Sequence, residues 1–256
     1  SGNFDPTLKK WIGSGGTINW VKVGLPRDAY FAKINNYDVS LKSSTIRVDT
    51  VTMTSPYFSK PIQGSLSDRA FKINREEDKV FPQFLSFERK LMIKDIVPDV
   101  DYSGGFAMQG ADFLGAGTTT DLAKITIKKA GKPFMQARSL EIFISQKKVF
   151  VPRGQFALYL NSGDSISHPG LALNYDLAKK EVLLNRSRNG MGEAPFQDSY
   201  HKLDIYVPKI IWEKDADVLT FTYDFGTSQE QRYATFESQG YFDVQLYDRL
   251  QAMEAT

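Results

Sequence analysis

The chain has 256 residues, of which 41% are hydrophobic, and its 32 basic and 30 acidic residues leave a formal net charge of +2. This hydrophobic fraction is enough to build a core, which excludes a disordered chain. The charges are interleaved and form no basic stripe, so nucleic acid is not expected as a partner. Cysteine is absent, which excludes disulfides, thiol chemistry and cysteine zinc sites. No stretch approaches the roughly 18 apolar residues of a transmembrane helix, so none is expected.

The first part of the chain, residues 1–68, is predicted to be an N-terminal β subdomain. Residues 4–13 have a weakly helical or irregular pattern, and a glycine-rich loop follows them. Beyond it, period-two alternation and turn residues predict a run of short strands. The opening Ser1-Gly2 resembles a cleavage scar, so we expect the chain to be a piece of a longer protein.

A charged stretch at residues 69–79 is predicted to be the loop that separates this subdomain from the main β domain, residues 80–256. Its adjacent acidic residues Glu76, Glu77 and Asp78 invite a calcium site. The spacing lacks the glycine of an EF-hand loop, which favours a solvated connection.

The main domain begins with residues 80–96, rich in large apolar side chains, and continues through the glycine-rich residues 100–120. The glycine spacing matches no phosphate-binding loop and is typical of strand bulges and sheet corners. Residues 121–186 then form a ladder of alternating strands, and residues 187–202 a long loop. Near Tyr247, apolar residues three and four apart predict a short amphipathic helix that packs at a sheet end or edge.

The predicted fold class is therefore all-β, with short helices only at the ends. The breaks between strands are too short for parallel crossovers within one layer, so neighbours are mostly antiparallel or form successive rungs. Because the strands are many, short and serially connected, an elongated β-solenoid or β-groove is favoured over the alternative, a β-sandwich or jelly roll.

The two histidines, His168 and His201, follow similar Asp-Ser segments that start at Asp164 and Asp198. If the two segments met, the four side chains could hold a metal, but no HExxH motif supports this. A catalytic triad is disfavoured because strand neighbours point to opposite faces and no GxSxG elbow is present. The preferred interpretation is hydrogen bonding in turns, with no catalytic residue, no metal and no cofactor.

Four aromatic residues are candidate ligand-binding positions: Trp20, Tyr206, Trp212 and Tyr223. Exposed planar rings could stack on sugars, as in carbohydrate-binding β-sandwiches. Most aromatics here alternate with polar residues, which instead favours a place in the core.

Residues 170–186 carry Tyr175-Asp176, a basic turn at Lys179-Lys180 and an apolar returning strand, Val182-Leu183-Leu184. This pattern resembles the hairpin unit of OstA-like envelope proteins. The rhythm of residues 132–152 is comparable, and the surroundings of Gly64, Gly110 and Ala137 are similar to repeating strands of AsmA- and TamB-like bridge proteins. The resemblance covers about a quarter of the chain and extends to large uncharacterised bacterial envelope proteins. It implies an open β-groove whose apolar lining carries lipid between the two membranes of a Gram-negative envelope.

We therefore expect a non-catalytic structural or scaffold segment of a larger bacterial envelope protein, in the periplasm or at the cell surface; its more specific form is a segment that lines a lipid-conducting groove. Absence of cysteine is compatible with this oxidising location. The alternative is a carbohydrate-binding or adhesive module. The expected partners are the rest of its own longer chain and a lipid or a glycan. In the groove hypothesis, Ile125, Ile127 and Leu158 are lining residues, but alternation alone leaves open whether a second sheet covers their face.

Overall fold

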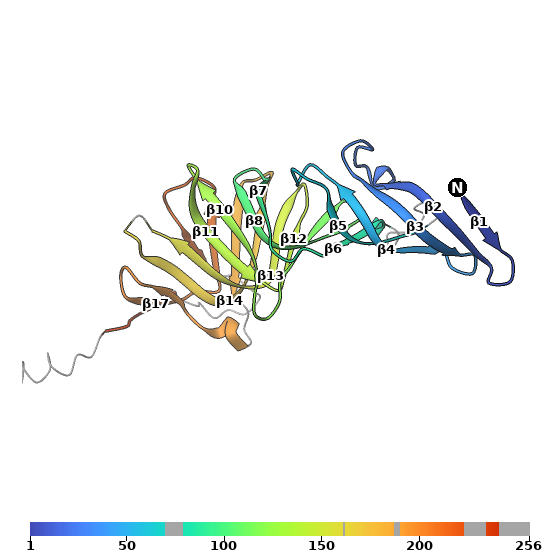
Figure 1. Cartoon of the computed structure of the whole chain (residues 1–256). Helices are drawn as coiled ribbons and strands as arrows, with labels where there is room; N and C mark the ends of the chain where they lie inside the picture. The colour runs from blue at the N-terminus through green and yellow to red at the C-terminus, as the bar shows by residue number, and fades with distance from the viewer. Residues whose placement is uncertain (70–78, 161, 187–189, 223–233, 241–256) are drawn as a thin grey trace, which may run out of the picture.

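The computed structural model describes residues 1–69, 79–160, 162–186, 190–222 and 234–240. Its 20 strands are joined edge to edge by antiparallel pairings into one hydrogen-bonded sheet (Figure 1). Within these ranges the helical elements with assigned bounds are two 3₁₀ turns, η1 (Val21–Val23) and η3 (Gly190–Glu193). The all-β prediction is confirmed. The helix predicted near Tyr247 lies outside the described residues.

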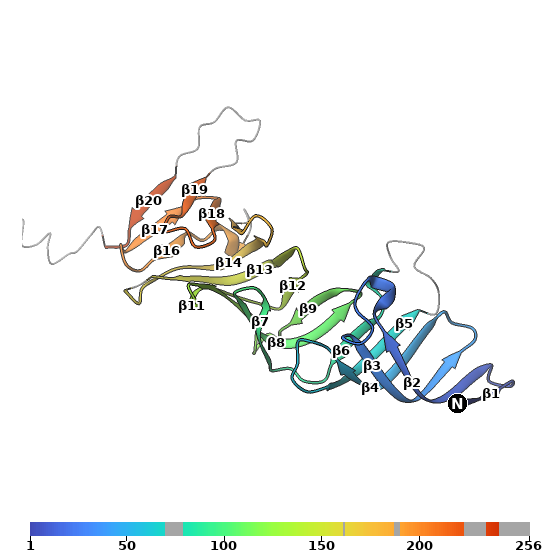
Figure 2. The ribbon, with the colours of Figure 1, turned by 90° about the horizontal axis from the view of Figure 1, so that it is seen from above.

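The N-terminal part is a meander in which each strand pairs with the next, and Figure 2 shows it projecting from the rest of the protein. Its strands are β1 (Gly2–Asp5), β2 (Lys10–Asn19), β3 (Phe31–Ser40), β4 (Thr45–Thr54), β5 (Ile62–Arg69) and β6 (Gln83–Ser86). Residues 4–13, predicted to be helical or irregular, belong instead to the β1–β2 hairpin, where Phe4 lies opposite Trp11. Strands β5 and β6 pair with each other on either side of residues 70–78, and the division of the chain at 69–79 stays a prediction.

Three long strands organise the remainder, because the two halves of each pair with different neighbours. They are β8 (Val100–Gln109), β13 (Lys148–Tyr159) and β14 (Ser165–Asp176). Strand β8 changes partners at Gly104, whose φ of 153° is unfavourable for other residues. Strand β13 shifts register between Val151 and Gly154, and β14 changes partners next to Pro169-Gly170. Each long strand therefore belongs to two regions of the sheet, one on each side of its bend.

The pairings define two layers. The first layer contains the first half of β8, the second half of β13 and the first half of β14, together with β7 (Leu91–Val97), β10 (Ala123–Lys129), β11 (Lys132–Ser139), β16 (Phe196–Asp198), β17 (Leu203–Tyr206) and β20 (Thr235–Ser238). The second layer contains the other halves, together with β6, β9 (Asp112–Ala116), β12 (Glu141–Ile144), β15 (Glu181–Arg186), β18 (Lys209–Glu213) and β19 (Thr220–Thr222).

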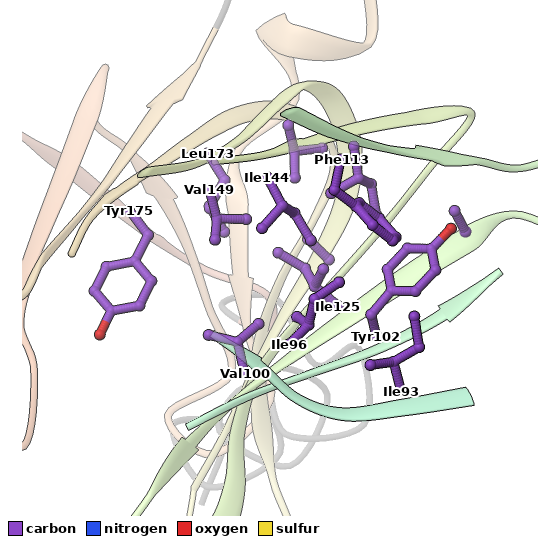
Figure 3. Close-up of a cluster of buried hydrophobic side chains, with 14 of the residues drawn as sticks. Ile93, Ile96, Val100, Tyr102, Phe113, Ile125, Ile144, Val149, Leu173 and Tyr175 are labelled. Atoms are coloured by element: carbon purple, nitrogen blue, oxygen red, sulfur yellow. The ribbon is translucent and has the colours of Figure 1, made fainter. Parts of the chain in front are cut away.

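The core lies between these layers. Figure 3 shows side chains from β7, β8 and β10 meeting side chains from β9, β12, β13 and β14. The rings of Tyr102 in the first layer and Phe113 in the second lie 4.8 Å apart in an edge-to-face arrangement. All these pairings are antiparallel, as the short connections predict, and this disfavours a solenoid of parallel rungs. The elongated groove is not confirmed, because antiparallel pairing is compatible with a groove and with a sandwich. From β6 to β19 the arrangement corresponds to the sandwich alternative.

Candidate functional site

The two layers do not close on each other everywhere. At one end of the sandwich, β11, β13, β14, β17 and β20 line one side of a cavity of about 1580 Å³, and β18, β19 and the segment between them line the other. This volume exceeds the ~300–1,000 Å³ typical of small-molecule sites. Its lining includes apolar side chains, among them Phe134, Leu158, Ile166, Leu203, Ile205, Trp212, Leu219, Phe221 and Phe236, together with polar and charged ones. We call this cavity the end cleft.

An aromatic pair links the two layers at the end cleft. Trp212 of β18 lies 4.5 Å from Phe134 of β11, measured between ring centroids. The indole Nε1 of Trp212 donates a 3.0 Å hydrogen bond to the carbonyl oxygen of Ala216. The backbone thus satisfies the polar atom of Trp212, and the indole, 1% exposed, packs between the layers beside the cleft.

An ion pair crosses the rim of the end cleft. Nζ of Lys129, at the end of β10, donates to the carbonyl oxygen of Ala216 at 2.8 Å and to Oδ1 of Asp217 at 2.7 Å. The same ammonium lies 5.4 Å from the centroid of the Phe134 ring. Lys129 holds the pKa of the Asp217 carboxyl below its usual range through a hydrogen bond and charge attraction. Lys132, which also lines the cleft, is exposed.

On the other side of the cleft, Asp198 organises a turn. Its Oδ1 accepts hydrogen bonds from the backbone N–H groups of Tyr200 and His201, and Nδ1 of His201 lies 2.8 Å from its Oδ2. The Asp198 side chain is 6% exposed, so both oxygens of a buried carboxylate are used within the turn. This is the turn-forming role predicted for the Asp-Ser segments.

His168 sits at the bend of β14, where backbone groups hold it in one tautomer. Its Nε2 lies 2.9 Å from the carbonyl oxygen of Ala194, and its Nδ1 accepts a 3.0 Å hydrogen bond from the N–H of Gly170. The proton must therefore be on Nε2. Burial lowers the pKa of His168 to about 4, so the ring is neutral near pH 7.

The two histidine segments do meet, because β14 pairs with β16 and Ile166 lies opposite Asp198. Their side chains nevertheless do not converge. Asp164 accepts a hydrogen bond from Ser199, Asp198 binds His201, and His168 bonds only to the backbone. Within the described ranges, no group of three or more His, Cys, Asp or Glu side chains could hold a metal ion. The arrangement does not assemble the hypothetical metal site.

Of the four predicted binding aromatics, Trp20 and Trp212 are buried, at 0% and 1% exposed. A glycan platform needs exposed rings, so Trp20 and Trp212 do not form one. Both are core residues. Tyr206 is half-buried, with the Arg186 guanidinium 5.9 Å from its ring centroid. Tyr223 lies outside the described residues.

Two aromatic residues that the sequence did not single out matter more. Phe134 lines the end cleft, and its position depends on a register irregularity between β10 and β11 that period-two alternation does not reveal. Trp11 is the one tryptophan of the three that is exposed, at 38%. Its ring lies against Gly2, where a Cβ would come within 2.8 Å of it.

The three predicted groove residues divide between the core and the cleft. Ile125 and Ile127 are 0% and 1% exposed in the closed core. They do not line the end cleft, because the second layer covers their face. Leu158 does line it.

No protein-family model, curated protein or solved structure matches the chain. No helical segment among the described residues has the length and apolar character needed to cross a bilayer. The described residues form an all-β fold in which the strands from β6 onward pack in two layers, and the end cleft lies at one end of these layers.

Proposed function

We propose that this chain is a non-catalytic binding and scaffold module whose end cleft holds the apolar part of an amphipathic ligand, such as a lipid acyl chain. The observation that carries the proposal is the contrast between the closed core and the open cleft. Leu158, Ile166 and Ile205 form an apolar floor that continues the core toward a large open volume.

An apolar ligand is favoured by the energetics of such a lining. Each methylene removed from water contributes about 0.8 kcal/mol, so a ten-carbon chain would contribute on the order of 8 kcal/mol before the cost of association. The aliphatic and aromatic side chains of the cleft offer few hydrogen-bonding groups, whereas another part of the lining is polar and contains Lys129, Lys132, Gln136, Asp198, His201 and Asp217. A polar group on the apolar part would lose its hydration without replacement, so the mixed lining favours a ligand with an apolar chain and a polar end.

The proposed setting is the envelope of a Gram-negative bacterium, with the rest of a longer chain as the structural partner. Its support is the resemblance of residues 170–186 to OstA-like hairpins together with the absence of cysteine. In this setting the module would bind or pass on lipid at the open end of a sandwich instead of along a continuous groove.

Binding of a neutral fluorescent probe, the methyl ester of 11-(dansylamino)undecanoic acid, tests the proposal. Dansyl emission should rise and shift to shorter wavelength on binding. Phe236→Asp, at a cleft residue 50% exposed, should reduce affinity at least tenfold without unfolding the protein. The matched control is Phe87→Asp, at a residue 53% exposed outside the cleft lining, and it should bind as the wild type does. Equal loss in both variants, or no binding to the folded wild type, would refute the proposal.

Carbohydrate binding is a second candidate function, which a different observation favours. Phe4 and Trp11 are opposite each other on one face of the β1–β2 hairpin and are 49% and 38% exposed. Tyr37 shares this face, with its ring against Gly13. Such flat exposed rings can stack on sugars. A glycan array tests this candidate: a hit that Trp11→Ala removes supports it, and a blank array with folded protein counts against it.

A further inference from the structure

We infer, on the basis of the proposed function, that the ligand of the end cleft carries an anionic headgroup, and that this headgroup binds Lys129 and Lys132 by displacing Asp217. The ligand class would then be an anionic amphiphile, such as a fatty acid or an acidic phospholipid. The inference concerns the polar end of the ligand, which the apolar lining does not specify.

The first observation is the pairing of two lysines. Lys129 and Lys132 are directly opposite each other in the β10–β11 hairpin. Like charges at opposed positions of an antiparallel pair disfavour the hairpin. Asp217 pairs with Lys129 at 2.7 Å, while among the described residues no carboxylate forms an ion pair with Lys132. One anion shared between the two ammonium groups would relieve this repulsion.

The second observation is that Asp217 can be released. Its side chain is 95% exposed, whereas that of Lys129 is 25% exposed. Exposed carboxylates form weak ion pairs, so a competing anion loses little by replacing one. The carbonyl oxygen of Ala216 and the ring of Phe134 continue to hold the Lys129 ammonium in place. The lysine is therefore a positioned anion receptor with an exchangeable partner.

The remaining charges of the cleft favour the same sign of ligand. The other lining carboxylate is Asp198, which is buried and uses both oxygens within its own turn. Among the described lining residues, a cationic headgroup would have only Asp217 to bind and would lie beside two lysines. An anionic headgroup meets both lysines and leaves Asp198 undisturbed.

Charge-matched ligands of one chain length test the inference. The probes are 11-(dansylamino)undecanoic acid, its neutral methyl ester, and an analogue of the same length that ends in a quaternary ammonium. At pH 7.5 and low salt the acid should bind the wild type at least tenfold more tightly than the ester does. Asp217→Asn should strengthen binding of the acid severalfold and leave the ester unchanged, because it removes the competing carboxylate.

The double variant K129Q/K132Q should bind the acid no more tightly than the ester. The control K42Q/K60Q removes the same net charge at exposed positions outside the cleft lining and should keep the wild-type preference. Equal affinity for acid and ester, tighter binding of the quaternary ammonium, or weaker acid binding by Asp217→Asn would overturn the inference while leaving the proposed function standing. Failure of all three probes to bind would instead refute the proposed function and the inference together.

Discussion

Acidification should destabilise this protein through one buried histidine. His168 is 2% exposed, and its Nδ1 accepts a hydrogen bond from the backbone N–H of Gly170 at the bend of β14. Protonation of Nδ1 would remove this acceptor and place a charge beside the Phe196 ring, whose centroid lies 4.9 Å away. The folded state therefore resists protonation, and the unfolded chain does not.

The size of the effect comes from the pKa difference between the two states. The pKa of His168 is lowered from 6.5 to about 4 in the folded protein. At 1.36 kcal/mol per pKa unit, the neutral ring contributes roughly 3 kcal/mol of stability above pH 6.5. Between pH 6.5 and about 4 the unfolded state binds a proton that the folded state does not, so this contribution is lost as the pH falls through that window.

Urea unfolding at several pH values between 7 and 4 measures the effect. His168→Asn has no titrating ring, so the loss of unfolding free energy on acidification should be smaller by roughly 3 kcal/mol than in the wild type. His201→Gln removes the other histidine and keeps His168. This variant should lose as much unfolding free energy on acidification as the wild type does. An equal pH dependence in the wild type and His168→Asn would refute the reasoning.

Three further changes test the packing. Leu173→Ala, at a core residue 1% exposed, should lower the unfolding free energy by about 2–5 kcal/mol, whereas Leu140→Ala, at a residue 48% exposed, should change it by less than about 0.5 kcal/mol; chemical denaturation distinguishes them. Gly104→Ala should lower the melting temperature, because φ is 153° and the added Cβ would come within 2.5 Å of a tyrosine hydroxyl; an unchanged melting temperature would mean that β8 does not bend there. Lys214→Gln should cost up to about 1 kcal/mol by removing the 2.9 Å ion pair with the partly exposed Asp99 that joins the layers, and a loss unaffected by salt would contradict this electrostatic account.

Local alternation predicted much of the fold, and its failures have identifiable causes. Ala123, Ile125 and Ile127 alternate with polar residues and are all buried, as the period of two indicates. The prediction of short strands fails at β13 and β14, which continue through Arg153-Gly154 and Pro169-Gly170. These positions are bends at which a strand crosses between the layers, β13 from the second to the first and β14 from the first to the second.

The end cleft could not be predicted from the sequence because it depends on which distant strands face each other. Phe134 and Trp212 are 78 positions apart in the chain, by subtraction of their numbers, and no local pattern brings their rings within 4.5 Å. Trp11 was missed for a local reason. The glycines around it were interpreted as a loop, whereas they lie in paired strands whose small residues accommodate aromatic rings.

The most direct test of the central claim is to locate a bound acyl chain on the protein by NMR. The methyl ester of 16-doxylstearic acid, which carries a paramagnetic group near its apolar end and no charge, should broaden the amide signals of Leu158, Ile205 and Phe221 most strongly. Signals from β1 to β3 should be unaffected at the same ratio of ligand to protein. Uniform broadening, or the strongest broadening around Phe4 and Trp11, would contradict the assignment of the end cleft as the lipid site.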